Sequence, residues 1–347
     1  MNASSLYIET LKKLRARIDL ELDEADSLLE AIFQQHLSEI QVAGLLVTLA
    51  SKGESINEIA GFARAMRRYA LKLDRQQKQL VDTAGTGGDC CGTFNISTAA
   101  AFVIAGAGVP VAKHGNRAIS GRCGSADVLT NLGVRIDAPK DVLERCLASC
   151  GITFLFAPAF HQAMKVVSRV RKELGIRTIF NLLGPLLNPA GAKRQIIGVY
   201  SPHLTEVFAE VLRLLGCEHA LIFSGEDGLD EITVSHRTKV TEIKAGQIRT
   251  QYLEPESFGM QRTPIEQLVG GDTAENGRIL QDILEVRLNG AKQDVVLLNA
   301  AAGIYVSGRV DSIHDGLALA RMSLESRRAL EKLEKLVAFS NQKASEP

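Results

Sequence analysis

The chain has 347 residues, of which 46% are hydrophobic, so it is long enough to form two domains with sizeable cores. Forty Lys and Arg residues balance forty Asp and Glu residues, which excludes the excess positive charge of a general nucleic-acid-binding protein. The six cysteines show no CxxC pair or Cys/His zinc spacing, and no apolar run has the length of a membrane span. We therefore expect a cytoplasmic protein with reduced thiols and no membrane partner.

The first 75 residues show the periodicity of short amphipathic helices. Residues 22–37 form one such pattern. Two more begin with capping boxes, Ser38 with Gln41 and Ser55 with Glu58, and Gly53 ends the first of these. Short helices with short connections predict a small helical domain.

From about residue 80, short β-rich runs alternate with helical stretches. The β-rich runs are LVDTAGTGG, GVPVAKHG, ITFLFAP, RQIIGVYS and HALIFSG. This alternation predicts a mainly parallel sheet with helices on both faces, and ligands of such sheets bind at the carboxyl ends of the strands. Residues 232–256 predict a hairpin with its turn at Ala245-Gly246, and the apolar run VVLLNAAAGIYVSG is followed by helices.

Residues 160–190 interrupt this alternation with a basic, amphipathic, mostly helical stretch that we expect to pack with the N-terminal helices. The predicted fold is a small all-α domain plus a larger α/β domain with a mainly parallel central sheet. The helical domain comprises residues 1–75 and about 160–190. The α/β domain comprises residues 76–159 and 191–347.

A glycine-rich loop, GTGGD at residues 85–89, follows a predicted strand and precedes a helix that opens near Ser97 and Thr98. Its glycines let backbone N–H groups converge on an anion, and the start of a helix favours phosphate. The loop is neither a Walker loop nor a dinucleotide fingerprint. Taken alone, the motif leaves an ordinary turn and a phosphate cradle equally open.

A second glycine- and serine-rich segment, VAKHGNRAISGRCGSAD at residues 111–127, places Lys113, His114, Asn116 and Arg117 on a turn after an apolar strand. The alternative is a solvated basic loop. Two such loops at one sheet edge favour a polyphosphate site, because both present donors to the same ligand.

Two further groups complete the candidate site. Asp230 and Glu231 form either a solvated acidic loop or a Mg²⁺ site, since Mg²⁺ prefers carboxylate and phosphate oxygens. Arg171, with Arg177 and His161 nearby in the sequence, is either a surface arginine or a fork for a carboxylate.

Together, GTGGD, NIST (95–98), KHGNR (113–117), GSADVL (124–129), LGIRTIFNLLGPLLNP (174–189) and the Asp-Glu pair resemble the anthranilate phosphoribosyltransferase family over nearly the whole chain. The resemblance implies a Mg²⁺-dependent transfer of the phosphoribosyl group of 5-phosphoribosyl 1-diphosphate to anthranilate in tryptophan biosynthesis. It also implies a homodimer joined through the helical domains.

The resemblance assigns roles by position. Lys113 and Arg171 would be catalytic, and Ser97, Asp230 and Glu231 would hold Mg²⁺. Anthranilate would contact Gly85, His114, Asn116, His161 and Arg171. The donor would be held by Gly85, Gly88, Asp89, Thr93, Asn95, Ile96, Ser97, Thr98, Lys113, His114, Gly115, Asn116, Arg117, Ala118, Ile119, Ser120, Gly121 and Ser125.

The chain departs from many relatives at Gln162, Arg169 and Gly121, the first two near the expected entry of the aromatic acceptor. Two other functions remain as alternatives. A related transferase or phosphorylase would use a nucleobase as acceptor. A non-catalytic paralogue would bind nucleic acid, but it should have lost the donor motifs and gained positive charge.

Overall fold

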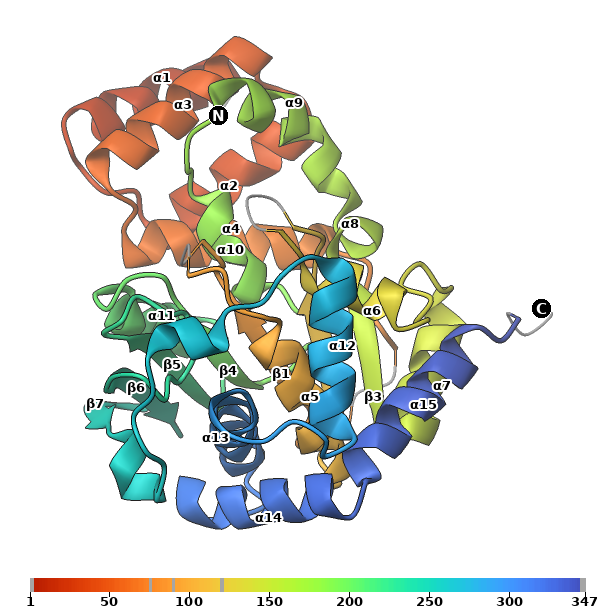
Figure 1. The fold of residues 1–347 in the computed structure, drawn as a ribbon. Coiled ribbons are helices and arrows are strands. Elements are labelled where there is room, and N and C mark those ends of the chain that lie inside the picture. Colours follow the sequence, from red (N-terminus) through yellow and green to blue (C-terminus); the bar gives the residue numbers. More distant parts are fainter. Residues whose placement is uncertain (1–2, 75–76, 89–90, 119–121, 344–347) are drawn as a thin grey trace.

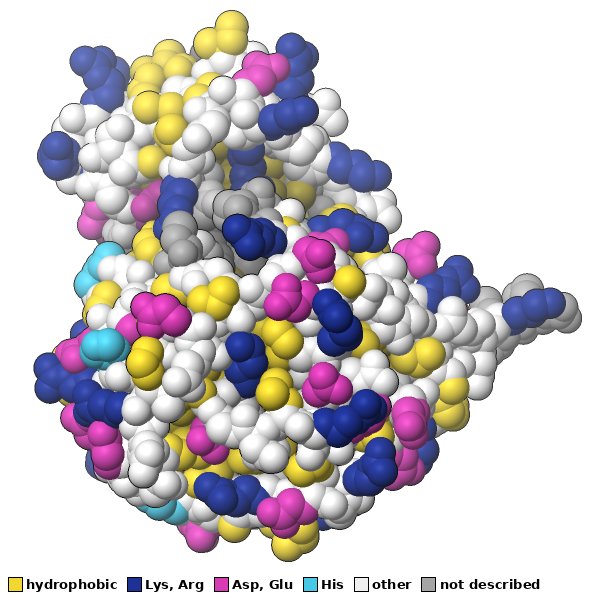
Figure 2. Space-filling model, viewed as in Figure 1, with side chains coloured by type: hydrophobic (Ala, Val, Ile, Leu, Met, Phe, Trp, Pro, Cys, Tyr) yellow, Lys and Arg dark blue, Asp and Glu magenta, His cyan; other side chains and the backbone are white. Residues whose placement is uncertain are grey.

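The computed structural model describes residues 3–74, 77–88, 91–118 and 122–343 of the chain. Figure 1 shows a helical body stacked on one end of a larger α/β body, with the α8–α10 segment reaching back to the N-terminal helices, and Figure 2 shows the same two bodies as a space-filling view from the same side. This arrangement confirms the predicted fold class.

The helical body is built from locally encoded helices. Ser38 accepts a hydrogen bond from the backbone of Gln41, whose side chain accepts one from the backbone of Ser38 at 2.9 Å, so the predicted capping box is confirmed. The box of Ser55 and Glu58 is also confirmed. The helices here are α1 (Ala3–Arg15), α2 (Leu22–Phe33), α3 (Glu39–Lys52), α4 (Ile56–Tyr69), α8 (Ala157–Phe160), α9 (Lys165–Leu174) and α10 (Phe180–Leu183).

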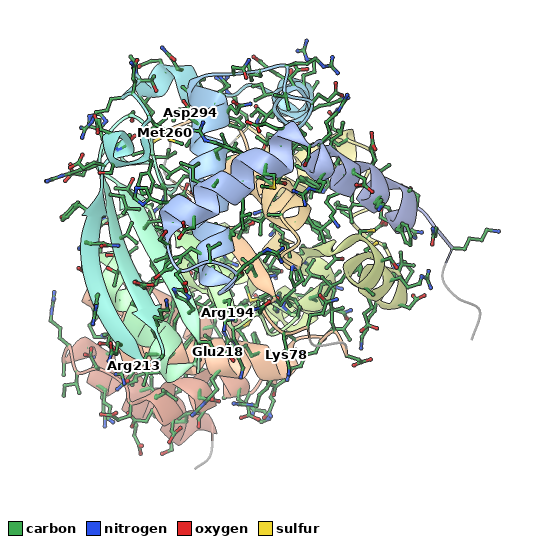
Figure 3. The ribbon with its side chains drawn as sticks, turned by 90° about the horizontal axis from the view of Figure 1, so that it is seen from below. Lys78, Arg194, Arg213, Glu218, Met260 and Asp294 are labelled. Carbon is green, nitrogen blue, oxygen red and sulfur yellow. The ribbon has the colours of Figure 1, made fainter. Side chains whose placement is uncertain are left out.

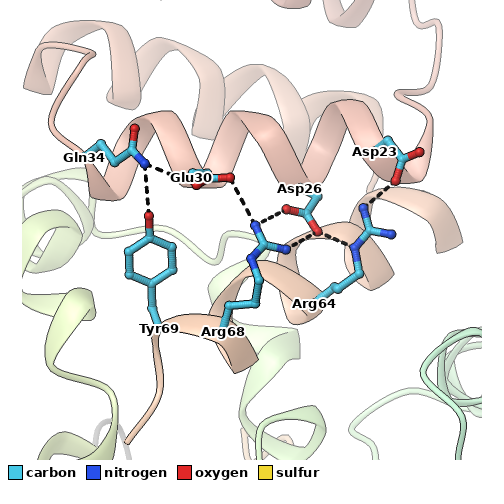
Figure 4. A network of polar contacts seen from close by, with 7 residues as sticks. All are labelled: Asp23, Asp26, Glu30, Gln34, Arg64, Arg68 and Tyr69. Atoms are coloured by element: carbon cyan, nitrogen blue, oxygen red, sulfur yellow. Dashed lines mark hydrogen bonds and ion pairs between the residues drawn. The ribbon is translucent and has the colours of Figure 1, made fainter.

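A buried carboxylate joins two of these helices. Asp26 on α2 is 4% exposed and receives hydrogen bonds from Arg64 and Arg68 on α4, as Figure 4 shows. Because the guanidinium groups satisfy both of its oxygens, the charge is tolerated inside the bundle.

The α/β body contains a seven-stranded sheet in the order β3-β2-β1-β4-β5-β6-β7. The first five strands are parallel, and β6 and β7 form the predicted antiparallel hairpin, turning through Ala245 and Gly246, both at positive φ. The strands are β1 (Val81–Gly85), β2 (Val111–Gly115), β3 (Ile152–Phe156), β4 (Arg194–Gly198), β5 (His219–Gly225), β6 (Thr238–Lys244) and β7 (Gln247–Leu253).

The two faces of the sheet belong to different hydrophobic clusters. One face packs with α5 and α13, and this cluster extends to α7, α14 and α15. The other face packs with α11, and its cluster continues through α4 into the helical body, including Val167, Val170 and Ile179 of the insertion. The remaining helices are α5 (Ile96–Gly106), α6 (Ser125–Asn131), α7 (Lys140–Cys150), α11 (Leu204–Leu214), α12 (Thr273–Leu284), α13 (Ala291–Val306), α14 (Ile313–Glu325) and α15 (Arg328–Ser340).

The strand order places a topological switch point beside β1. After β1 the chain goes to β2 on one side, whereas β4 lies on the other, so the order reverses between β1 and β4. Ligands of open parallel sheets bind at such a reversal, outside the carboxyl ends of the strands. The opposite edge carries surface ion pairs such as Arg194 with Glu218 at 3.3 Å (Figure 3).

Candidate active site

The first glycine loop follows β1 at this switch point. Gly87 and Gly88 have φ values of 65° and 82°, a conformation that favours glycine. The Gly87 N–H donates to Asp230 Oδ2 at 2.9 Å. On the other side Arg177 donates to the Gly88 carbonyl at 2.9 Å, and its guanidinium lies 4.2 Å from the ring centroid of Tyr200. The loop is therefore tied both to the carboxylate pair and to the helical insertion.

Lys113 and His114 lie inside β2 and are buried, at 5% and 7% exposure, so their predicted position on a turn after the strand is wrong. The strand continues through them because buried polar partners replace water. The Lys113 ammonium donates to the Thr83 carbonyl and lies 3.2 Å from both Thr83 Oγ1 and Ser97 Oγ. Burial lowers the pKa of Lys113, and the carboxylates of Asp82, Glu231 and Asp230 oppose that effect.

A fully buried carboxyl group lies beneath this lysine. Asp82 on β1 accepts from the His114 backbone N–H at 3.0 Å and from Gln195 at 3.4 Å. Burial raises the pKa of Asp82 to about 6. Sequence reasoning missed both Asp82 and Gln195; the available signal was a charged residue within the apolar run LVDTAG.

The imidazoles of His114 and His161 are in contact, with 3.2 Å between their Nε2 atoms. His114 Nδ1 lies 3.2 Å from the Gly184 carbonyl, which can only accept, so this nitrogen carries the proton. His114 Nε2 is then an acceptor and His161 Nε2–H the donor. Burial lowers the pKa values to about 3 and about 4, respectively, so both rings are neutral at neutral pH.

Asp230 and Glu231 lie on the β5–β6 loop and face the first glycine loop and the start of α5. Glu231 is 9% exposed and accepts from the Ser97 N–H at 3.0 Å. Close packing fixes the loop, since a Cβ on Gly198 would lie 1.6 Å from the Asp230 carbonyl oxygen. The pair is therefore not a solvated acidic loop.

The oxygen atoms of Asp230, Glu231 and Ser97 are of the type that binds Mg²⁺. The described residues contain no cluster of three or more His, Cys, Asp or Glu side chains that could hold a metal ion by themselves. Two carboxylates with the hydroxyl of Ser97 leave several coordination positions for water and substrate oxygens, which is how Mg²⁺ is usually bound.

The second loop is organised by Asp127 near the start of α6. Its carboxylate accepts from Arg117 at 2.8 Å and from the backbone of Ala118 and Gly124 at 2.9 and 3.0 Å. Asn95 donates to the Cys123 carbonyl at 3.1 Å, so the two loops are in contact. Sequence reasoning missed Asp127, although an acidic residue three positions after Gly124 is typical of a helix start.

Arg171 on α9 is a half-buried cation whose guanidinium lies 5.3 Å from the ring centroid of Phe180. Burial lowers its pKa, and no carboxylate in the described part of the chain forms a salt bridge with it. Arg169, two residues earlier, is instead paired with Glu173 at 2.8 Å and Glu39 at 3.5 Å. The guanidinium of Arg171 thus has no carboxylate partner among the described residues.

Residues 8–70 match the helical bundle domain of a glycosyl transferase family, and residues 77–330 match the a/b domain of that family. Anthranilate phosphoribosyltransferase from Pelotomaculum thermopropionicum is 48% identical over 95% of both chains. The enzyme of that name from Rubrobacter xylanophilus is 49% identical over 97% of this chain and 98% of its own. The chain belongs to the anthranilate phosphoribosyltransferase family.

Solved structures of the anthranilate phosphoribosyltransferase family superpose over nearly the whole molecule. The enzyme from Thermus thermophilus has a TM-score of 0.91 and 44% identity, covering 96% of this chain and 99% of its own. The Saccharomyces cerevisiae enzyme in complex with PRPP and Mg has a TM-score of 0.89 and 30% identity, and the match covers 97% of this chain and 98% of the yeast chain. No helix within the described residues combines the length and apolarity needed to cross a membrane.

The structure brings most residues predicted from the family resemblance to one edge of the sheet. They lie on β1, on β2, on the loops that follow the strands and at the starts of α5 and α6: Gly85, Gly88, Asn95, Ser97, Lys113, Asn116, Ser125, Asp230 and Glu231. Thr93 forms an isolated antiparallel β-bridge with Val269, and the side chain of Thr98 is buried within α5 at 1% exposure. Asp89, Ile119, Ser120 and Gly121 lie outside the described residues.

Proposed function

We propose that this protein transfers the phosphoribosyl group of 5-phosphoribosyl 1-diphosphate to the amine of anthranilate, releasing diphosphate, in the cytoplasmic biosynthesis of tryptophan. The observation that carries the proposal is the buried ammonium of Lys113, which lies between Thr83 and Ser97 and interacts with the carboxylates of Asp230 and Glu231 beside the first glycine loop. Such a site combines donors for an anion with ligands for a divalent cation.

The donor's phosphate groups would lie on the two loops. The glycine loop after β1, the start of α5 and the described part of the second loop would line the phosphate site, and the donor would take over the Gly87 and Ser97 N–H groups that now bind Asp230 and Glu231. Lys113 would stabilise negative charge that develops on the leaving diphosphate, because a preorganised cation costs no reorganisation during the reaction. Ser97, Asp230 and Glu231 would hold Mg²⁺, which supplies further charge stabilisation to the leaving group.

The acceptor would be fixed by its carboxylate rather than activated by a base. Arg171 offers a guanidinium fork that no carboxylate of the described residues occupies, and Gly85 and Asn116 are exposed beside the donor loops. The aromatic amine is neutral at neutral pH and needs orientation more than deprotonation. His114 and His161 are neutral and buried, so we assign them to the wall of the acceptor path.

We further propose a homodimer joined through the helical body. Ile8 on α1 is 46% exposed, and Ile40 and Val47 on α3 are 85% and 38% exposed. Apolar side chains gathered on one surface favour association. Sedimentation of the wild type and of an Ile40→Glu variant measures this directly, and equal monomer mass for both would refute it.

Acceptor choice tests the proposed reaction. The protein is incubated with 5-phosphoribosyl 1-diphosphate, Mg²⁺ and either anthranilate or uracil, and released diphosphate is measured. We expect release with anthranilate alone. Release with uracil, or phosphorolysis of uridine, would instead support a nucleobase acceptor.

A further inference from the structure

One residue with a polar side chain lies among the buried residues of α13 in the α/β body. α13 is described along its whole length, and its buried residues are Ala291, Val295–Ile304 and Val306. Among these, Asn299 is the single residue with a polar side chain, and it is 0% exposed. Burying an amide is unfavourable unless its donors and acceptor are satisfied, so its partners explain its presence.

Asn299 binds both backbone groups of one residue. Its Oδ1 accepts from the Ile232 N–H at 3.0 Å, and its Nδ2 donates to the Ile232 carbonyl at 2.8 Å. Nδ2 also donates to the Val295 carbonyl at 2.8 Å, one turn earlier in α13. Since the three partners require an acceptor on one side and a double donor on the other, the amide orientation is fixed.

Ile232 directly follows Glu231, so this clamp acts on the backbone that carries the carboxylate pair. On the other side of the pair, Gly225 N–H donates to the Leu229 carbonyl at 2.8 Å, and Asp227 accepts from the Leu229 N–H at 3.2 Å. The pair is therefore held at both ends. Asn299 is the anchor that ties it to the rigid core, because α13 packs against β1, β4 and β5.

Mg²⁺ requires near-ideal octahedral geometry, so its affinity depends on groups that orient the ligands as well as on the ligands themselves. We propose that Asn299 is a positioning residue for the Mg²⁺ ligands Asp230 and Glu231, acting through the backbone of Ile232. This inference rests on the proposed function, in which those carboxylates hold the metal of the donor complex.

The test is the Mg²⁺ dependence of donor binding, measured by calorimetry without anthranilate so that no transfer occurs. Asn299→Asp preserves size and the acceptor for the Ile232 N–H, but its carboxylate cannot donate to the Ile232 carbonyl. We expect the Mg²⁺ concentration for half-maximal donor binding to rise at least tenfold. At saturating Mg²⁺, kcat should stay within about threefold of wild type, since the ligands themselves remain.

The matched control is Ser323→Ala on α14. Ser323 is also fully buried and donates to the Val103 carbonyl at 2.8 Å, so the variant loses a buried hydrogen bond away from the carboxylate loop. We expect no change in its Mg²⁺ dependence. If N299D does not fold, Asn299→Ser, whose short hydroxyl cannot reach both backbone groups, is measured in the same way.

The Asp230→Asn and Glu231→Gln variants distinguish failure of the Mg²⁺ site from failure of the positioning role of Asn299. If these variants shift the Mg²⁺ dependence while the Asn299 variants do not, the positioning role is refuted and the metal site stands. If neither set shifts it, the metal site of the proposed function fails and the positioning role fails with it. An equal shift in Ser323→Ala would also refute the positioning role, because general loosening of the core would then explain the effect.

Discussion

Gly198 offers the sharpest perturbation of the carboxylate pair without removing any ligand. It ends β4 beside β1, and its carbonyl accepts from the Thr86 N–H at 2.9 Å. A Cβ at this position would lie 1.6 Å from the Asp230 carbonyl oxygen and 2.6 Å from its carbonyl carbon. Both contacts are with backbone, so no side-chain rotation can relieve them.

The Gly198→Ala substitution must therefore move the loop. Ordinary van der Waals contact begins near 3.4 Å, so relief from 1.6 Å requires a retreat of about 2 Å. Such overpacking costs about 1–3 kcal/mol of stability. A displacement of about 1 Å at a reacting centre can lower the rate about 100-fold, so we expect at least that loss in kcat/KM.

The assay is anthranilate consumption at several Mg²⁺ concentrations, with thermal unfolding measured in parallel. The matched control is Gly44→Ala in the middle of α3, where a Cβ meets only Tyr7 Oη at an ordinary 3.7 Å. That variant should keep full activity and gain up to about 1 kcal/mol of stability, because alanine favours helix. If G198A matched G44A in activity and Mg²⁺ dependence, the proposed role of the loop would be wrong.

Three further experiments probe the metal site, the acceptor contact and the buried titratable groups. Asp230→Asn combined with Glu231→Gln should raise the Mg²⁺ requirement at least tenfold in steady-state titrations; an unchanged requirement would remove both from the metal site. Arg171→Ala should raise the anthranilate KM at least tenfold, and Arg171→Lys should recover part of it, whereas an unchanged KM would refute the carboxylate contact. Urea unfolding at several pH values tests the buried Asp82 and His161. Burial raises the pKa of Asp82 to about 6, so its stabilisation is complete below about pH 4 and lost as the pH rises through about 6. Burial lowers the pKa of His161 to about 4, so its stabilisation is complete above about pH 6.5 and lost as the pH falls through about 4. As the pH falls from about 7 to about 4, Asp82→Asn should therefore lose about 2 kcal/mol relative to wild type, and His161→Asn should gain about 3 kcal/mol; parallel pH profiles would contradict both assignments.

Local signals in the sequence predicted much of the fold. The capping boxes at Ser38 and Ser55 and the hairpin turn at Ala245-Gly246 depend on neighbouring residues, so short windows contain the information. The parallel sheet followed from alternating strand and helix patterns. The shared edge of the two glycine loops followed from the direction of parallel strands.

The buried polar network was not predictable in this way because its partners are distant in sequence. The sequence pattern predicts Lys113 on a turn after the strand, and only the contacts with Thr83 and Ser97 explain why it lies within the strand. Asp82 is the one charged residue in the run LVDTAG and Asn299 the one amide in VVLLNAAAGIYVSG, and the sequence pattern does not show which groups form hydrogen bonds with them. In both cases a polar residue where an apolar one is expected was the available signal.

The most direct test of the proposed reaction is the loss of anthranilate fluorescence on addition of 5-phosphoribosyl 1-diphosphate, first with Mg²⁺ and then with EDTA. We predict a loss that requires the donor, stops with EDTA and is matched mole for mole by diphosphate. Unchanged fluorescence in the presence of Mg²⁺ and a donor that calorimetry shows to be bound would contradict the proposed acceptor while leaving the donor site in place.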